Sequence, residues 1–150
     1  MRWDGMKAPR VLLSVITVMA HHTLPFDKAS VAIVTGGESG IGRSAAIALG
    51  KTGIPVALTF FADEIQANTV VAEIEDGGGR AVAIRTDVGD EQAVEALFDL
   101  AEAHFGTVDL LVNSAGLNMT GIMLRDMELA QFDRLIRADL YGPFLTCRRM

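Results

Sequence analysis

A glycine-rich stretch at residues 35–42 (TGGESGIG) has the residue spacing with the clearest chemical meaning in this sequence. Gly36 allows a sharp turn, and Gly40 leaves bare backbone against which a phosphate group can lie. Gly42 allows close packing of the next helix, whose unpaired N–H groups and partial positive charge attract an anion. A glycine turn alone is also typical of a plain tight turn, and G-x3-G-x-G differs from the commoner G-x-G-x-x-G. Its place between an apolar run and a helical pattern favours a phosphate site.

Three further clusters of polar residues and glycines lie after expected strands or in the last expected helix. They are Asp87-Val88, Asn113-Ser114-Ala115-Gly116 and Asp139-Leu140-Tyr141-Gly142-Pro143-Phe144. Taken alone, Asp87 is typical of a turn or a helix cap, and Asn113 of a turn residue whose side chain ties its strand to the glycine turn. Asp139 falls on an apolar helix stripe, where a carboxylate is costly and needs a reason.

In this order, the four clusters resemble the motifs of the short-chain dehydrogenase/reductase family. Residues 35–42 match its TGxxxGIG motif, and residues 113–116 resemble NNAG with Ser114 in place of the second Asn. Residues 139–144 resemble N-L-x-G-x-F with Asp139 in place of Asn, and the resemblance covers residues 27–150. It implies a nicotinamide dinucleotide across the carboxyl ends of the strands. The residues implied in cofactor binding are Gly36, Ser39, Gly40, Ile41, Gly42, Asp87, Val88, Asn113, Ala115 and Gly116.

The resemblance also implies hydride transfer between nicotinamide and a carbonyl or alcohol substrate. The family uses a Ser and a Tyr-x-x-x-Lys beyond the last motif, and we expect this chain to stop before both. Its one tyrosine, Tyr141, is followed four residues later by Leu145 rather than Lys. Without that proton donor, efficient transfer is not expected. Asp139 is the remaining catalytic candidate, because Pro143 has no N–H and frees the Asp139 carbonyl, which the resemblance implies holds a relay water.

The residue that meets the adenosine ribose decides between NAD(H) and NADP(H). An NAD site has a carboxylate about 20 residues after the glycines, where it would repel a 2′-phosphate. The strand expected at residues 56–60 ends in Phe60, and Asp63 falls in the loop beyond it. No Lys or Arg lies in that loop, and Arg43 is the one base near the glycine turn. The missing carboxylate favours NADP(H) over NAD(H).

Alternating strands and helices must position these clusters. Short apolar runs predict strands at residues 30–35, 56–60, 81–86 and 108–112. Apolar stripes predict helices from about Arg43 to Gly53, over residues 67–76, over residues 90–105 and around residues 132–140. The alternation predicts an α/β fold, a Rossmann-type doubly wound parallel sheet with helices on both faces, truncated after the fourth strand and the following helix. Such a truncation would leave the fourth strand with an unpaired edge.

The first 26 residues differ from the rest. A basic start precedes an apolar stretch, residues 11–26, that has no formal charge and is too short to span a membrane. The segment has signal-peptide features, but Met19 is also typical of an ordinary start shortly before the first strand, and a packed N-terminal element is a third interpretation. We therefore divide the chain into an N-terminal extension, residues 1–26, and an NAD(P)-binding Rossmann part, residues 27–150. A chain beginning at Met19 is expected to be as stable as the full chain.

Composition limits the class of protein. The chain has 150 residues, of which 50% are hydrophobic, enough for a core. A net charge of −6 argues against a nucleic-acid partner. Cys147 is the single cysteine and the histidines lack ligand spacing, so no disulfide or metal site is expected. The family resemblance implies a cytoplasmic protein with a small carbonyl or alcohol substrate, no membrane partner, and a homo-oligomer if complete.

Two functions of different classes stay open. The chain is either the N-terminal part of an NAD(P)-dependent carbonyl reductase or alcohol dehydrogenase, or a non-catalytic nucleotide-binding module, an inactive truncated fragment. A Tyr-x-x-x-Lys encoded in some frame beyond codon 150 would favour the enzyme.

Overall fold

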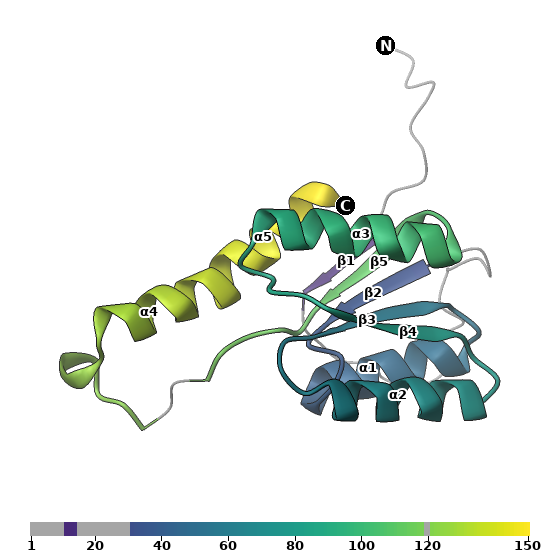
Figure 1. Cartoon of the computed structure of the whole chain (residues 1–150), viewed down its shortest axis with the longest axis horizontal. Helices are drawn as coiled ribbons and strands as arrows, with labels where there is room; N and C mark the ends of the chain where they lie inside the picture. The colour runs from purple at the N-terminus through teal and green to yellow at the C-terminus, as the bar shows by residue number, and fades with distance from the viewer. Residues whose placement is uncertain (1–10, 15–30, 119–120) are drawn as a thin grey trace, which may run out of the picture.

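The sheet consists of five parallel strands. The computed structural model describes residues 11–14, 31–118 and 121–150. Within them the strands lie in the order β1-β5-β2-β3-β4 (Figure 1). They are Val11–Ser14 (β1), Val31–Thr35 (β2), Val56–Phe60 (β3), Ala81–Arg85 (β4) and Val108–Asn113 (β5). The predicted fold class, an α/β Rossmann-type parallel sheet, is confirmed.

Helices cover both faces of this sheet. They are α1 (Gly40–Lys51), α2 (Glu64–Asp76), α3 (Glu91–Phe105), α4 (Leu129–Ile136) and α5 (Gly142–Arg149). A 3-10 turn, Leu124–Asp126, precedes α4, and a π-helical turn, Arg137–Tyr141, joins α4 to α5. In Figure 1, α1 and α2 lie on one face of the sheet and α3 and α5 on the other, whereas α4 extends away from the body.

The hydrophobic core has two halves, one on each face of the sheet. Ala32 and Val34 of β2 pack with residues of α1 and α2, whereas Val31 and Ile33 pack with residues of α3. Because helices cover both faces, every residue of β2 and β3 is buried. Continuous apolar runs are typical of such doubly covered parallel strands, which is why the sequence predicts these two strands.

Aspartates and glycines fix the helix ends. Asp63 Oδ1 accepts the N–H of Gln66 at 2.9 Å at the start of α2, and Asp90 Oδ1 accepts the N–H of Ala93 at 3.0 Å at the start of α3. Both are N-caps that satisfy an otherwise unpaired backbone donor. Gly106, with φ of 100°, ends α3 in a conformation that favours glycine.

The edge of β5 differs from our expectation. We predicted an unpaired edge for this strand, but β1 pairs with it in parallel, from Val11 opposite Leu110 to Ser14 opposite Asn113. The 16 residues between β1 and β2 can extend to about 50 Å, enough to return to the start of the sheet. The backbone N–H and C=O groups at this edge of β5, which could otherwise pair with another chain, are therefore covered by β1.

This pairing reverses the expectation that a chain beginning at Met19 is as stable as the full chain. Deleting residues 1–18 should expose the β5 edge, accelerate amide exchange at Leu110 and Leu111 by about tenfold or more, and promote self-association. Deleting only residues 1–10 keeps β1 and is the matched control. Hydrogen-exchange mass spectrometry and light scattering on both deletions measure the effect. Equal exchange in the two deletions would contradict the pairing.

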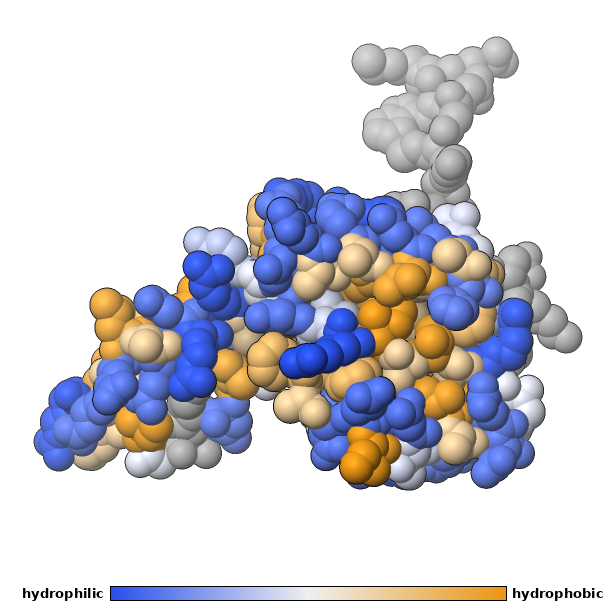
Figure 2. Space-filling model, viewed as in Figure 1, coloured by the Kyte–Doolittle hydropathy of each residue, from blue (hydrophilic) through white to orange (hydrophobic). Residues whose placement is uncertain are grey.

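The opposite edge of the sheet is formed by β4. Ala81, Val82 and Ala83 are half-buried there, and Figure 2 shows hydrophobic residues gathered on this face between α3 and α2. Mostly hydrophilic residues cover the helices around them (Figure 2). Beyond the body, Leu129 and Phe132 are exposed on α4.

Candidate functional site

The candidate site lies where the chain reverses direction across the sheet. From β2 the sheet continues through β3 and β4 on one side, whereas β5 lies on the other side of β2. Ligands of open α/β sheets bind in the crevice beyond the carboxyl ends of the strands at such a switch point. The glycine turn after β2 and the loop after β5 both lie at this end of the strands.

Thr35 holds these two segments together. Its Oγ1 accepts the N–H of Ser114 at 3.0 Å and the N–H of Ala115 at 3.1 Å, and the residue is only 1% exposed. Thr59 holds the turn on the other side. Its Oγ1 accepts the N–H of Gly36 at 3.0 Å, and its carbonyl accepts the N–H of Gly37 at 2.9 Å. The sequence analysis did not predict either threonine as a residue that holds the turn. The available signal was a threonine at or near the end of each buried strand.

Three of the four glycines of the turn, Gly36, Gly40 and Gly42, have different environments. A Cβ on Gly36, which has φ of 62°, would lie 2.9 Å from the Ala115 nitrogen. A Cβ on Gly42 would lie 2.1 Å from the Gly36 carbonyl oxygen. A Cβ on Gly40, which has φ of 53°, would meet nothing within 4 Å. Gly36 and Gly42 therefore allow close packing, whereas Gly40 faces open space at the start of α1.

The start of α1 can receive an anion. Ser39 stands at the N-cap without a side-chain cap bond, and the first helical bond runs from the Arg43 N–H to the Ser39 carbonyl at 2.9 Å. The N–H groups of the residues between them have no partner within the helix, and the helix dipole adds partial positive charge. Ile41 is 70% exposed beside them.

Glu38, in the middle of the turn, contributes an unusual acceptor. Its Oε2 atom is buried and has no hydrogen-bond partner among the described residues. A buried carboxylate oxygen without a donor is costly, so this atom fits a ligand that supplies an O–H or N–H.

Asp87 and Val88 have separate roles at the end of β4. Asp87 Oδ1 accepts the N–H of Gly89 at 2.9 Å, as in the turn interpretation of this residue taken alone, and its side chain is exposed. Val88 is buried, and a Cβ on Gly142 would lie 2.8 Å from its Cγ2 atom. Val88 therefore packs against the start of α5.

Asn113 corrects a prediction. We expected its side chain to tie β5 to the glycine turn, but the side chain turns to α5 instead. Its Oδ1 accepts the Thr146 hydroxyl at 2.8 Å, and its Nδ2 donates to Cys147 Sγ at 3.5 Å. The tie to the glycine turn is made by the backbone of Ser114 and Ala115, as described above.

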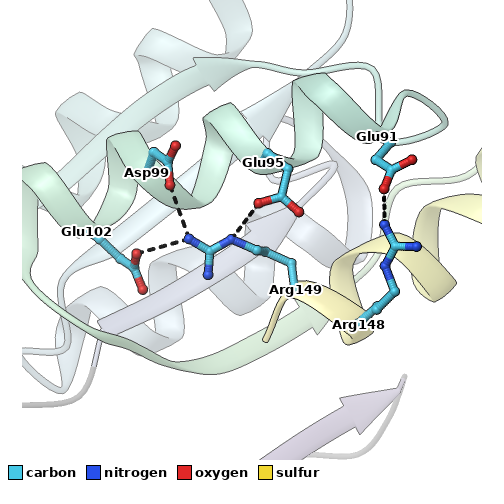
Figure 3. Close-up of polar contacts among 6 residues, drawn as sticks. All are labelled: Glu91, Glu95, Asp99, Glu102, Arg148 and Arg149. Atoms are coloured by element: carbon cyan, nitrogen blue, oxygen red, sulfur yellow. Dashed lines mark hydrogen bonds and ion pairs between the residues drawn. The ribbon is translucent and has the colours of Figure 1, made fainter.

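Ion pairs fasten α5 onto α3 and so support Asn113. In Figure 3, Arg149 reaches Glu95, Asp99 and Glu102 of α3, at 2.8, 3.1 and 3.2 Å, and Arg148 pairs with Glu91. The Arg149 guanidinium also lies 5.2 Å from the ring centroid of Phe98. Partial burial opposes its charge, but hydrogen bonds to Asp99 and Glu102 outweigh this and raise the pKa of Arg149 above its ordinary value.

Asp139, the catalytic candidate, lies in the π-helical turn. We treated it as a carboxylate in an apolar setting, and this is wrong because Asp139 is exposed. Its Oδ1 accepts the N–H of Leu117 at 2.7 Å, and a Cβ on Gly116 would lie 3.1 Å from that oxygen. The side chain thus holds the loop after β5, while Pro143 follows in the first turn of α5.

This hydrogen bond predicts how Asp139 variants behave. Asp139→Ala should lower the free energy of unfolding by about 1 kcal/mol, because the Leu117 N–H loses its acceptor. Asp139→Asn keeps an acceptor oxygen and should change it by less than about 0.5 kcal/mol. Urea unfolding of both variants measures this. Equal losses in Asn and Ala would mean that the negative charge, rather than the hydrogen bond, matters.

The charged residues near the end of β3 were predicted incompletely. Asp63 caps α2, as described above, rather than ending β3. Arg43 forms an ion pair with Glu73 of α2. Arg43 is not the one nearby base, because Arg85 at the end of β4 donates from Nε to the Phe61 carbonyl at 3.2 Å. The register Phe60 opposite Arg85 brings this base to the end of β3.

The described residues contain neither a membrane span nor a metal cluster. No helix there is long and apolar enough to cross a membrane. No group of three or more His, Cys, Asp or Glu side chains in those residues could hold a metal ion.

Comparison with known proteins identifies the family. The model of the family described as "short chain dehydrogenase" matches residues 30–150, so the chain belongs to the short-chain dehydrogenase family. Glucose 1-dehydrogenase 2 of Bacillus subtilis is 38% identical over 117 residues, covering 78% of this chain and 45% of that protein. A 3-oxoacyl-[acyl-carrier-protein] reductase of Synechocystis is 38% identical over 120 residues, covering 80% and 48%.

Solved structures of short-chain dehydrogenases are similar to this chain in fold and in sequence. A short chain dehydrogenase from Burkholderia cenocepacia in complex with NADP matches with a TM-score of 0.76 and 36% identity, covering 81% of this chain and 49% of that chain. A metagenomic short-chain oxidoreductase in complex with NADP has the same TM-score and identity and is covered to 55%. The chain spans about half the length of the relatives that it matches.

Proposed function

We propose that this chain is the cofactor-binding part of an NADP(H)-dependent oxidoreductase that interconverts a carbonyl and an alcohol. The observation that carries the proposal is the glycine turn at the switch point, with Gly40 facing open space at the start of α1 and Gly36 packed against Ala115. Membership of an oxidoreductase family gives the reaction class.

The residues present fit a dinucleotide. The first-turn N–H groups of α1 would hold the pyrophosphate, with Ser39, Gly40, Ile41 and Gly42 around it. The orphaned Oε2 of Glu38 fits a ribose hydroxyl donor. The remaining contacts proposed from the family motifs are Gly36, Asp87, Val88, Asn113, Ala115 and Gly116, all on the carboxyl side of the sheet.

Bound NADPH would supply a hydride, and the chain's own residues would position it. The exposed Ile41 lies at the helix start, where an apolar contact orients a ligand. In the π-helical turn, we propose that the Asp139 main-chain carbonyl, freed by Pro143, holds a water. No Tyr-x-x-x-Lys occurs in these 150 residues, and we assign no proton donor among them.

The finer features of the proposal follow from the same chemistry. NADP(H) is favoured over NAD(H), because no carboxylate ends β3 and two relatives of known structure contain NADP. We propose a small carbonyl or alcohol substrate, a cytoplasmic location, no nucleic-acid or membrane partner, and a homo-oligomer for the complete protein. The division at residue 26 stays a prediction.

A second function is a nucleotide-binding module without catalysis. Reading the gene beyond codon 150 separates the two functions, because the enzyme requires a Tyr-x-x-x-Lys in some frame.

A calorimetric titration of the 150-residue chain with NADPH, and in parallel with NADH, tests the binding function common to both proposals. We expect saturable binding of NADPH with one site per chain and weaker binding of NADH. Absence of binding by either dinucleotide to the folded chain would overturn the proposed function.

A further inference from the structure

Arg85 has a position that its place in the sequence does not reveal. It ends β4, 43 residues after Gly42, where the glycine turn ends, and 24 residues after Phe61. Parallel pairing nevertheless places Arg85 opposite Phe60, and the Thr86 N–H donates to the Phe60 carbonyl at 2.9 Å. The guanidinium therefore lies at the point where the chain leaves β3.

The hydrogen bond from Arg85 to this segment leaves most of the guanidinium free. Nε donates to the Phe61 carbonyl at 3.2 Å, which fixes the direction of the side chain. Arg85 is exposed and forms no ion pair among the described residues. A guanidinium has several N–H donors in a planar fork, and those on the two Nη atoms remain for a ligand.

Two charged residues near this point, Arg43 and Asp63, each already have a partner in α2. The Arg43 guanidinium is held by Glu73 of α2. Asp63, the nearest carboxylate along the chain after β3, accepts the N–H of Gln66 as the cap of α2. Arg85 forms no ion pair with a carboxylate of the described residues. Its positive charge is therefore available to an anion at the end of β3.

In dinucleotide-binding sheets, the residue at the end of the second strand of the unit meets the 2′ position of the adenosine ribose. That strand here is β3, which ends at Phe60 and is followed by Phe61 and Ala62 rather than by a carboxylate. A nearby arginine accommodates a 2′-phosphate at this place, and arginine and phosphate form bidentate, charge-assisted hydrogen bonds.

We propose that Arg85 binds the 2′-phosphate of NADP(H) and determines the preference of this site for NADP(H) over NAD(H). The proposal rests on the proposed function, because it requires the dinucleotide to lie at the carboxyl end of the sheet. It differs from the expectation drawn from the sequence, in which Arg43 was the base available near the turn.

The test compares ligands that differ only in the 2′-phosphate. Calorimetry of the 150-residue chain should show that Arg85→Gln lowers the affinity for NADPH and for adenosine 2′,5′-bisphosphate by about 10- to 100-fold. Binding of NADH and 5′-AMP should change by less than about twofold, since neither carries the phosphate. Circular dichroism and urea unfolding of the variant report on its fold.

Arg80→Gln is the matched control, because Arg80 precedes the amino end of the same strand and its guanidinium stacks on Phe105 with 5.5 Å to the ring centroid. It removes the same charge at the far end of β4 and should leave all four affinities unchanged. Arg43→Gln tests the alternative base and should not alter the ratio of NADPH to NADH affinity.

The outcomes separate this proposal from the proposed function. NADPH binding that Arg85→Gln leaves unchanged, or weakens equally with NADH, would overturn the role of Arg85 alone. A loss of discrimination in Arg43→Gln but not in Arg85→Gln would do the same. Failure of the unaltered chain to bind any of the four ligands would overturn the proposed function itself.

Discussion

Gly40→Val should abolish NADPH binding while leaving the chain folded. A Cβ at Gly40 meets no atom within 4 Å, so the valine side chain would project into open space. That space adjoins the first turn of α1, where the pyrophosphate is proposed to lie. The positive φ of 53° adds strain of about 1–2 kcal/mol for an L-residue, which should lower the melting temperature by several degrees.

Gly53→Val is the matched control for this prediction. Gly53 follows α1, has φ of 87°, and a Cβ there would likewise meet nothing within 4 Å. The substitution should therefore cost similar stability without affecting the ligand. Titration of both variants with NADPH decides the matter. Unaltered affinity in Gly40→Val, or equal loss in both variants, would show that the phosphate does not lie at Gly40.

Gly42→Ala should have the largest effect on stability. Its Cβ would lie 2.1 Å from the Gly36 carbonyl oxygen, which is backbone and cannot rotate away. Although alanine favours a helix more than glycine by up to about 1 kcal/mol, forced movement of α1 or the turn should outweigh this. We expect a net loss of about 3 kcal/mol in the free energy of unfolding, together with loss of nucleotide binding.

The comparison for Gly42→Ala is Gly50→Ala, the same change at a buried glycine of the same helix. A Cβ at Gly50 would meet the Ile74 Cγ2 atom at 2.5 Å, and a side chain can adjust where backbone cannot. Urea unfolding should therefore show a smaller loss for Gly50→Ala. A loss in Gly42→Ala no larger than that in Gly50→Ala would contradict the close contact between the helix start and the turn.

Features carried by neighbouring residues were predictable from the sequence. The strand expected at residues 56–60 is found as β3, and Asp90 begins α3 as expected, because apolar runs and caps are local signals. The glycine turn also lies where it was predicted, between β2 and α1. Gly42 lies against Gly36, in line with the expectation that it allows the helix to pack closely.

Features that depend on distant parts of the chain were not predictable in this way. β1 pairs with β5 about 100 residues away, and no pattern within residues 11–14 encodes that partner. Arg85 reaches Phe61 only because β3 and β4 are neighbours in a particular register. Asn113 and Asp139 were recognised as motif positions, but their hydrogen bonds to Thr146 and Leu117 depend on how the last helices pack.

The site of dinucleotide binding is tested most directly by two-dimensional ¹H–¹⁵N NMR of the 150-residue chain during titration with NADPH. The largest shifts should fall on the amides of Gly40, Ile41 and Gly42 and on those of residues 114–116, with β4 responding at Arg85 and Asp87. Amides at the amino ends of the strands, such as Val56 and Ala81, should remain unshifted. Saturable binding that shifts those amides and leaves the glycine turn unchanged would contradict the site described here.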